Sequence, residues 1–261
     1  MLWAALLAAF IALGVEVLRA RRALALLERR LAAASRSLEA LQQGFSRFAP
    51  AEVVEEIIAQ GVSTRSEKKD VTILFADLQD FTALAERLDP AVLVTILNGY
   101  LDRMSRVITA HRGHVAKFIG DGVLALFGAL EGNPWQTNDA VHAALAMRAG
   151  LADYNTTLAA DGLPRLATGV GIHRGTVVAG VMGSAELMEY GVIGRNVNLA
   201  ARVQDLTRTH RVDILVTEAV RSALDRRFRL RAMPATEVKG VAGALPTFAV
   251  DGFDENGAGP V

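Results

Sequence analysis

The sequence predicts an α+β domain in which helices cover one face of a β-sheet. A first observation is the apolar, β-branched run of residues 71–76, which is typical of a buried strand and ends on Asp77. A second is Asp121, which lies between two glycines and two apolar runs, as in a tight hairpin turn. A third is the order of elements, because helical patterns at residues 90–112 and 137–158 alternate with the predicted strands along the chain.

Length and composition set the outer bounds. With 261 residues, the chain has room for one core domain and accessory segments. Its 28 basic and 28 acidic side chains give a formal net charge of zero, so no basic excess indicates a nucleic acid partner. The absence of cysteine excludes disulfides and thiolate metal sites, and it fits a reducing compartment.

The N-terminal stretch predicts a membrane anchor over residues 1–18. It carries no charge before Glu16, and it is at the short end for a spanning helix. A cleaved signal peptide or a hydrophobic surface helix is the alternative, but no basic residue precedes the apolar run. The arginines that follow, from Arg19 to Arg30, favour a single pass through the inner membrane with the rest of the chain in the cytoplasm. Membrane lipid would then be a partner, and a membrane protein could be another.

A heptad repeat follows and predicts a coiled-coil dimerisation helix over residues 19–48. Its two apolar registers are Val17, Leu24, Leu31, Leu38 and Phe45, and Ala20, Leu27, Ala34, Leu41 and Phe48. The consequence is a homodimer, although an amphipathic helix docked on its own domain shows a similar pattern. Residues 49–69 predict a connector, in which Pro50 starts a short helix that ends at Gly61 and residues 62–69 form a polar linker.

The main domain is predicted over residues 70–251, with a disordered tail at residues 252–261. Glycines alternate with β-branched residues at residues 169–183, which predicts two strands joined by a hairpin at Arg174 and Gly175. The other predicted elements are a helix that starts at Asp89-Pro90, strands at residues 115–119, 123–127, 167–172, 213–216 and 247–250, a helix that starts within residues 189–203, and a short helix at residues 218–224.

Asp77 and Asp121 are the candidate chemical groups. Carboxylates at the ends of adjacent strands can share divalent cations and a polyphosphate, as in phosphoryl or nucleotidyl transfer. Alone, each has an ordinary alternative, because aspartates are common in turns and at helix caps. The helix predicted within residues 189–203 strengthens the chemical interpretation. It places Asn198 and Arg202 four residues apart on one face, where an amide and a guanidinium can orient a ribose and neutralise a phosphate oxygen.

Four motifs together resemble the class III adenylate/guanylate cyclase catalytic domain. They are FADLQDFT at residues 75–82, KFIGDG at 117–122, GIHRGTVVAG at 171–180 and YGVIGRNVNLAAR at 190–202. The resemblance covers about residues 65–250. It implies a ferredoxin-like core and an adenylate cyclase that converts ATP to 3′,5′-cyclic AMP and pyrophosphate in signal transduction. It also implies that the sites form between two antiparallel subunits of a homodimer, so that a monomer is inactive.

The resemblance also implies roles for individual residues. Asp77 and Asp121 would hold two Mg²⁺ or Mn²⁺ ions, with the backbone carbonyl of Leu78 as an extra ligand. Asn198 would position the ribose, and Arg202 would stabilise the pentavalent α-phosphate in the transition state.

Two further groups would bind the triphosphate. Backbone N–H groups of residues 79–82, including Phe81 and Thr82, would hold it at a helix start. Lys239 resembles a lysine that contacts the terminal phosphates, although a solvated surface lysine is an equal alternative.

Base selection is predicted from Lys117 and Gly191. In the family a lysine at the first position and an Asp or Thr at the second read adenine. Lys117 favours ATP, but Gly191 has no side chain that can accept a hydrogen bond. The loss of that contact would reduce discrimination by about tenfold at most, so relaxed selectivity is predicted, with a guanylate cyclase as the alternative.

Two departures from the family pattern, Asp80 and Arg195, and one histidine, His173, need separate interpretation. Asp80 stands where many relatives have glycine, and it either places a negative charge near the phosphates or caps the following helix. Arg195 stands where many have Asp, and it receives no role. His173 is predicted to be structural or exposed, because no second histidine lies at metal-ligand spacing.

Three rival functions remain. A weakly active pseudo-cyclase would act as a dimeric regulatory module. A membrane-anchored coiled-coil protein would explain residues 1–48 alone. A diguanylate cyclase would share the general fold, but the chain has no GGDEF-like turn.

Overall fold

The computed structural model describes residues 21, 24, 26–39, 66–184, 188–241 and 243–255. The chain divides into two units, Met1–Val62 and Ser63–Val261. The predicted anchor, residues 1–18, and the predicted connector up to residue 65 lie outside the described residues. Within the described ranges, no helix is long and apolar enough to cross a membrane.

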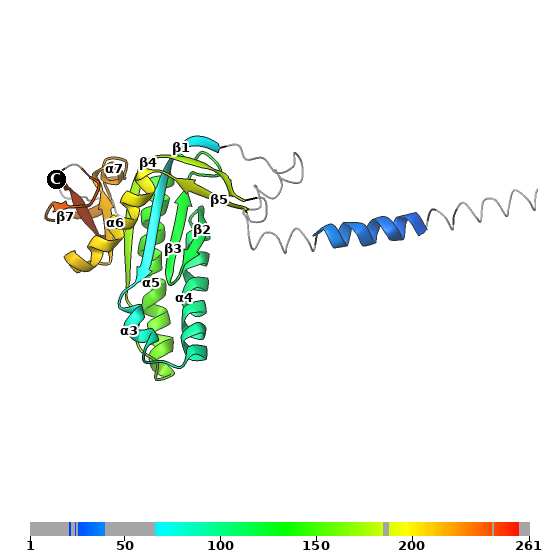
Figure 1. The fold of residues 1–261 in the computed structure, drawn as a ribbon, viewed down its shortest axis with the longest axis horizontal. Coiled ribbons are helices and arrows are strands. Elements are labelled where there is room, and N and C mark those ends of the chain that lie inside the picture. Colours follow the sequence, from blue (N-terminus) through cyan, green and yellow to red (C-terminus); the bar gives the residue numbers. More distant parts are fainter. Residues whose placement is uncertain are drawn as a thin grey trace, which may run out of the picture. The chain divides into compact units, whose positions relative to one another are not determined.

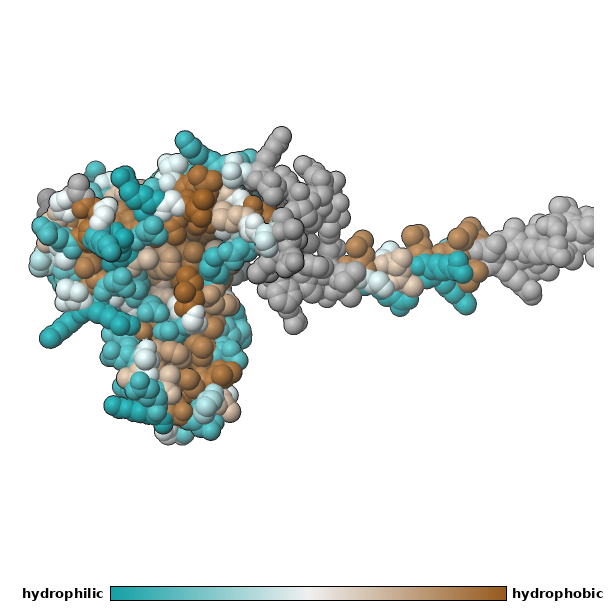
Figure 2. All heavy atoms as spheres, in the orientation of Figure 1, coloured by the Kyte–Doolittle hydropathy of each residue, from teal (hydrophilic) through white to brown (hydrophobic). Residues whose placement is uncertain are grey.

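The first unit contains one described helical stretch, residues 26–39, which lies inside the predicted coiled-coil segment. Four leucines of the heptad registers are 53–70% exposed here: Leu24, Leu27, Leu31 and Leu38. Figure 2 shows hydrophobic side chains gathered along one side of this helix and hydrophilic ones along the other. The helix is therefore amphipathic, and its pairing into a coiled coil stays a prediction.

The second unit is an α+β fold, as the sequence predicts (Figure 1). Its elements are β1 (Ser66–Leu78), α3 (Phe81–Ala85), α4 (Pro90–Ala110), β2 (Gly113–Ile119), β3 (Gly122–Phe127), α5 (Gln136–Ala160), β4 (Thr168–Gly183), β5 (Met188–Ile193), α6 (Arg195–His210), β6 (Ile214–Thr217), α7 (Glu218–Arg221), β7 (Phe228–Ala232), β8 (Thr236–Glu237), β9 (Ala244–Leu245) and β10 (Thr247–Phe253).

The main sheet has the strand order β2-β3-β1-β4-β6-β10-β7, and β5 pairs with β4. β4 and β6 run parallel, while β1 is antiparallel to both of its neighbours, β3 and β4. The pairing of β1 with β3 reaches Ala76 opposite Val123. Because β3 starts directly after the β2–β3 turn, this register brings the end of β1 beside that turn, which carries Asp121.

Helices cover both faces of the sheet, so the prediction of helices on one face is wrong. Leu74, Ala76 and Leu78 of β1 belong to a large core with residues of α4 and α5. Val71 and Ile73 point to the opposite face, where the core includes Ala200 of α6 and residues of β5. Successive strand residues point to opposite faces. Asp77 therefore belongs to the face that α6 covers.

β4 is one continuous strand, so the predicted hairpin at Arg174 and Gly175 is wrong. The glycines of this segment lie beneath α6, where a larger side chain would not fit. A Cβ on Gly171 would collide with the α6 backbone at Gln204, and one on Gly175 would collide with the Asn196 side chain. Glycine at alternate positions of β4 therefore permits α6 to pack directly onto the strand.

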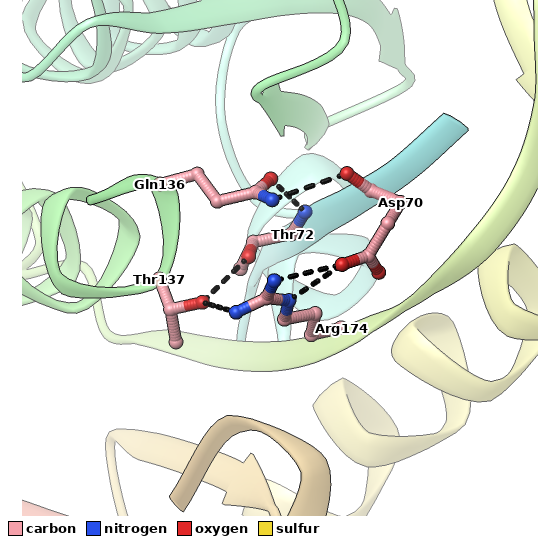
Figure 3. Close-up of polar contacts among 5 residues, drawn as sticks. All are labelled: Asp70, Thr72, Gln136, Thr137 and Arg174. Carbon is pink, nitrogen blue, oxygen red and sulfur yellow. Dashed lines mark hydrogen bonds and ion pairs between the residues drawn. The ribbon is translucent and has the colours of Figure 1, made fainter. Parts of the chain in front are cut away.

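A polar cluster fixes the first half of β1, at the point where its pairing with β3 ends (Figure 3). The side chain of Gln136 accepts a hydrogen bond from Thr72 N at 3.0 Å and donates one to Asp70 O at 3.1 Å, so it supplies the contacts of a neighbouring strand. Arg174 donates from Nε and Nη2 to Asp70 Oδ2, at 3.0 and 2.7 Å, and from Nη1 to Thr137 Oγ1. The start of α5 and the middle of β4 are thereby tied to β1.

The boundaries of several elements differ from prediction. β1 begins at Ser66, so the last residues of the predicted linker are strand. β10 runs to Phe253, so the tail predicted from residue 252 begins in a strand, where Phe253 stacks on Phe228 of β7. Strand β7 was not predicted. The start of α4 is confirmed, because the Asp89 side chain accepts a hydrogen bond from Ala91 N at 2.9 Å.

Candidate active site

Asp77 and Asp121 come together at one end of the sheet. Asp77 is the second-last residue of β1, and Asp121 lies in the two-residue turn between β2 and β3. Asp121 Oδ2 accepts a hydrogen bond from Leu78 N at 3.2 Å. Burial and the negative charge of Asp121 raise the pKa of Asp77 from 3.8 to about 6. The structure therefore brings the two predicted carboxylates together, and their role as metal ligands stays a prediction.

The backbone of Asp77 is held from the α4 side of the sheet. Thr168 Oγ1 donates a hydrogen bond to Asp77 O at 3.0 Å, and the Tyr100 hydroxyl lies 3.1 Å from Thr168 Oγ1. Tyr100 is fully buried in α4, and this burial raises the pKa of its hydroxyl above the ordinary value. Two linked hydroxyls therefore hold the backbone that carries the Asp77 carboxylate. Sequence reasoning missed both residues because their contact joins α4 to β4.

The donor set at this end of the sheet fits a divalent cation. Two carboxylates and the Leu78 carbonyl offer hard oxygen ligands, and two like charges held together attract a cation. In the described part of the chain, no group of three or more His, Cys, Asp or Glu side chains could hold a metal ion. Mg²⁺ commonly binds through one or two carboxylates and completes its shell with water and substrate phosphates. The residues present match that pattern.

Arg208 is a site residue that the sequence did not indicate. Its Nη2 donates to Leu78 O at 2.9 Å and lies 3.5 Å from Asp77 Oδ2. It comes from the last turn of α6, where a basic residue is ordinarily explained by the helix dipole. The contact exists because Asp77 points to the sheet face that α6 covers.

Phe81 and Thr82 begin α3, directly after the aspartate-bearing strand. Asp80 precedes them with φ 58°, in the left-handed region, and its side chain makes no cap hydrogen bond. The alternative that its carboxylate caps the helix is therefore excluded, and its effect on the phosphates stays a prediction. The backbone conformation explains why glycine suits this position, since glycine adopts positive φ without strain.

Asn198 and Arg202 line a second feature, a pocket of about 780 Å³ on the outer side of α6. Its other lining residues are His173, Arg195, Asn196, Leu199, Gly240 and Val241. Arg202 Nη1 lies 3.0 Å from the position of a Cβ on Gly240, so the loop that carries Lys239 approaches the guanidinium closely. Lys239 itself is exposed. The predicted ribose and phosphate residues thus share one pocket with the loop predicted to contact terminal phosphates.

His173 lies at this pocket and is structural, as predicted, although it sits in mid-strand. It is 7% exposed, and its Nδ1 and Nε2 lie 2.9 Å from Thr217 Oγ1 and 3.2 Å from Asn196 Oδ1. Asn196 Nδ2 donates to Thr176 O at 2.8 Å, so Asn196 Oδ1 is an acceptor and His173 donates from Nε2. Burial lowers the pKa of His173, which favours this neutral form. The first turn of α6 is thereby fixed to β4.

Lys117 forms an ion pair on the strand that carries Gly191. Lys117 Nζ is 2.5 Å from Glu189 Oε1 on β5. A Cβ on Gly191 would meet no atom within 4 Å, so this position faces open space. Glu189 and Gly191 are two residues apart on one strand and share a face. The structure therefore places a carboxylate beside Lys117 that sequence reasoning did not assign.

The two halves of the predicted site are separated within one chain. Arg208, which touches Asp77, and Arg202 are six residues apart on α6, about 9 Å along the helix axis and about 120° around it. Asn198 is about 15 Å from Arg208 along the axis. Neither Asp77 nor Asp121 is among the described residues that line the pocket of Asn198 and Arg202.

Comparison with known proteins decides the family. The sequence profile of the "Adenylate and Guanylate cyclase catalytic domain" matches residues 64–252. The chain belongs to this family. The cyclase domain therefore covers nearly all of the second unit that the structure describes, and the resemblance noted from the sequence motifs is confirmed.

Curated relatives of this cyclase domain include two bacterial adenylate cyclases. "Adenylate cyclase" of Anabaena cylindrica is 36% identical over 217 residues, which cover 79% of this chain and 42% of the relative. "Adenylate cyclase 1" of Rhizobium meliloti (strain 1021) is 31% identical, over 80% of this chain and 32% of the relative. The chain thus spans less than half the length of these relatives.

Solved cyclase structures share the fold. The guanylyl cyclase Cya2 has a TM-score of 0.69 and 33% identity, over 73% of this chain and 96% of that structure. The adenylyl cyclase CyaB from P. aeruginosa has a TM-score of 0.69 and 28% identity, over 73% and 98%. Because the fold is similar to both an adenylyl and a guanylyl cyclase, these comparisons do not distinguish ATP from GTP as the substrate.

Proposed function

We propose that this chain is an adenylate cyclase that converts ATP to 3′,5′-cyclic AMP and pyrophosphate at the interface of a homodimer. The observation that carries the proposal is the division of the site within one chain. Asp77 and Asp121 lie at one end of the sheet, while Asn198 and Arg202 line a separate pocket. Two copies in antiparallel arrangement would join each aspartate pair to the pocket of the partner, which gives two equivalent sites.

The aspartates would hold two Mg²⁺ or Mn²⁺ ions together with the nucleotide, and Leu78 would add its carbonyl. When bound, such ions would lower the pKa of the ribose 3′-hydroxyl and would compensate the negative charge of the pyrophosphate leaving group. The N–H groups before and within the first turn of α3, at Phe81 and Thr82, are close in sequence to the aspartates and suit the triphosphate.

From the partner, Asn198 would orient the ribose and Arg202 would stabilise negative charge on the α-phosphate. Lys239 would approach the terminal phosphates, since its loop lies against Arg202. Arg195, which lines the same pocket, adds a further positive charge to a site for a highly anionic substrate.

Base recognition would use Lys117 and Glu189. The ion pair offers one hydrogen-bond donor and one acceptor side by side. This suits adenine, which has an acceptor nitrogen beside the N6 amino donor, and it can also suit guanine, which has O6 as an acceptor. Glu189 thus compensates in part for Gly191, and ATP with incomplete exclusion of GTP is the substrate we infer.

Dimerisation is supported by the first unit. The exposed leucines of the helix at residues 26–39 provide the stripe that a coiled coil would bury. The anchor over residues 1–18, its lipid contacts and a cytoplasmic position of the cyclase domain are proposals that rest on the sequence.

Complementation between two inactive variants tests the proposal. Asp77→Ala and Arg202→Ala are purified separately and then unfolded and refolded together, and cyclic nucleotide is measured with Mn²⁺ and either ATP or GTP. Each variant alone is expected to be inactive. The mixture should recover about a quarter of the wild-type rate, because half of randomly paired dimers are mixed and each keeps one of two sites. Inactivity of verified mixed dimers would contradict a shared site, and an inactive wild-type dimer would favour the pseudo-cyclase.

A further inference from the structure

Arg208 occupies an unusual place beside the aspartates. Its Nη2 lies 2.9 Å from Leu78 O and 3.5 Å from Asp77 Oδ2, so one nitrogen contacts two oxygens of the candidate cation site. Its side chain is 51% exposed, which leaves it free to change rotamer at small cost. The guanidinium therefore neutralises the carboxylates without being locked into the core.

We propose that Arg208 is an internal counter-ion that fills the cation site of the metal-free enzyme and moves onto the triphosphate when metal and nucleotide bind. This inference rests on the proposed function for its second half. Its first half concerns the metal-free chain and holds whether or not the protein turns over a nucleotide.

Arg208 and a metal ion cannot occupy the cation site at the same time. Mg²⁺ binds oxygen ligands at 2.0–2.1 Å. An ion shared by Asp77 and Leu78 O would bind the same two oxygens that Nη2 contacts. The positive charge of the ion would also repel the guanidinium. Metal binding must therefore displace Arg208.

The surroundings give the displaced side chain a destination. A cavity of about 320 Å³ adjoins the site, and it is lined by Gln79, Asp80, Arg208, Arg211, Val212 and Asp213. Gln79 and Asp80, which directly precede the triphosphate groups proposed at Phe81 and Thr82, thus share this cavity with Arg208. A guanidinium forms strong, directional hydrogen bonds to phosphate oxygens. Arg208 would therefore add a phosphate contact from the protomer that carries the aspartates.

The two halves of the proposal predict opposite effects of one substitution. Arg208→Gln removes a competitor for the cation site and also removes a phosphate contact. Mn²⁺ binding without nucleotide should then tighten, on the order of fivefold, since a nearby positive charge is lost. The KM for Mn²⁺-ATP should rise, on the order of tenfold, which is the value of one charge-assisted hydrogen bond.

Mn²⁺ binding is measured on the full chain without nucleotide, from the decrease of the electron paramagnetic resonance signal of free Mn²⁺. Arg211→Gln is the matched control, because it removes one positive charge from the same cavity at a position three residues away. Its Mn²⁺ affinity should change less than twofold. Arg208→Lys keeps the charge and should lie between wild type and Arg208→Gln. If Arg208→Gln fails to fold, Arg208→Lys carries the same comparison.

The possible outcomes separate the two claims. Unchanged or weaker Mn²⁺ binding in Arg208→Gln would overturn the counter-ion role. Tighter Mn²⁺ binding with an unchanged KM would overturn the movement onto the triphosphate. Absence of cyclic nucleotide from the wild-type dimer would refute the proposed function, while the Mn²⁺ titration would still decide whether Arg208 competes for the cation site.

Discussion

Replacement of Asp77 by asparagine should stabilise the metal-free protein while it abolishes activity. Burial and the charge of Asp121 raise the pKa of Asp77 from 3.8 to about 6, even though Arg208 opposes the shift. The charged carboxylate is thus less favourable in the folded chain than in the unfolded one. Asparagine has nearly the same shape and no charge, so the unfavourable interaction disappears.

The expected stabilisation by Asp77→Asn follows from the change in the pKa of Asp77 on folding. A change from 3.8 to about 6 corresponds to about 3 kcal/mol at 1.4 kcal/mol per tenfold change in proton affinity. The Asp77 side chain is 34% exposed, so solvent screening reduces this to about 1–2 kcal/mol. The penalty is absent below pH 3.8, grows as pH rises toward 6, and is fully present above 6, because the folded state binds the proton more tightly.

Urea unfolding in the presence of a chelator measures the gain in the free energy of unfolding, at pH 7.5 and again near pH 4.5. Asp77→Asn should be more stable than wild type at pH 7.5, and the difference should shrink at the lower pH. Asp153→Asn, on the exposed side of α5, is the control and should remain within 0.5 kcal/mol of wild type. An Asp77→Asn protein that is no more stable at pH 7.5 would refute the electrostatic reasoning.

Three further substitutions test the scaffold and the base site. Gly171→Ala should destabilise the domain by more than about 2 kcal/mol, seen by thermal denaturation, because its methyl group meets the α6 backbone. Tyr100→Phe removes the hydrogen bond to Thr168 and should lower the free energy of unfolding by about 0.5–1.5 kcal/mol. It should also lower kcat with little change in KM. A kcat equal to that of wild type would show that this hydroxyl does not position the carboxylate. Glu189→Gln should change the ratio of kcat/KM for ATP to that for GTP by about tenfold at most, and an unchanged ratio would exclude the ion pair with Lys117 from base recognition.

Local sequence patterns were sufficient for the elements that carry the site. The apolar run before Asp77, the glycines around Asp121 and the helical spacing of Asn198 and Arg202 are signals within a few residues, and the structure has β1, the β2–β3 turn and α6 at those places. The cyclase family also followed from these motifs, because their residue types and spacing are specific.

Tertiary structure decided what those patterns left open. The glycines of residues 169–183 suggest a turn when taken alone, and only the packing of α6 against β4 shows that they make room for a helix. Arg208 reaches Asp77 across 131 positions in the sequence, and Glu189 reaches Lys117 across 72, so no local pattern could reveal either contact. Local periodicity determines which segments become strands and helices. The pairing of charges at the site depends on which sheet face each helix covers, and that is a property of the whole fold.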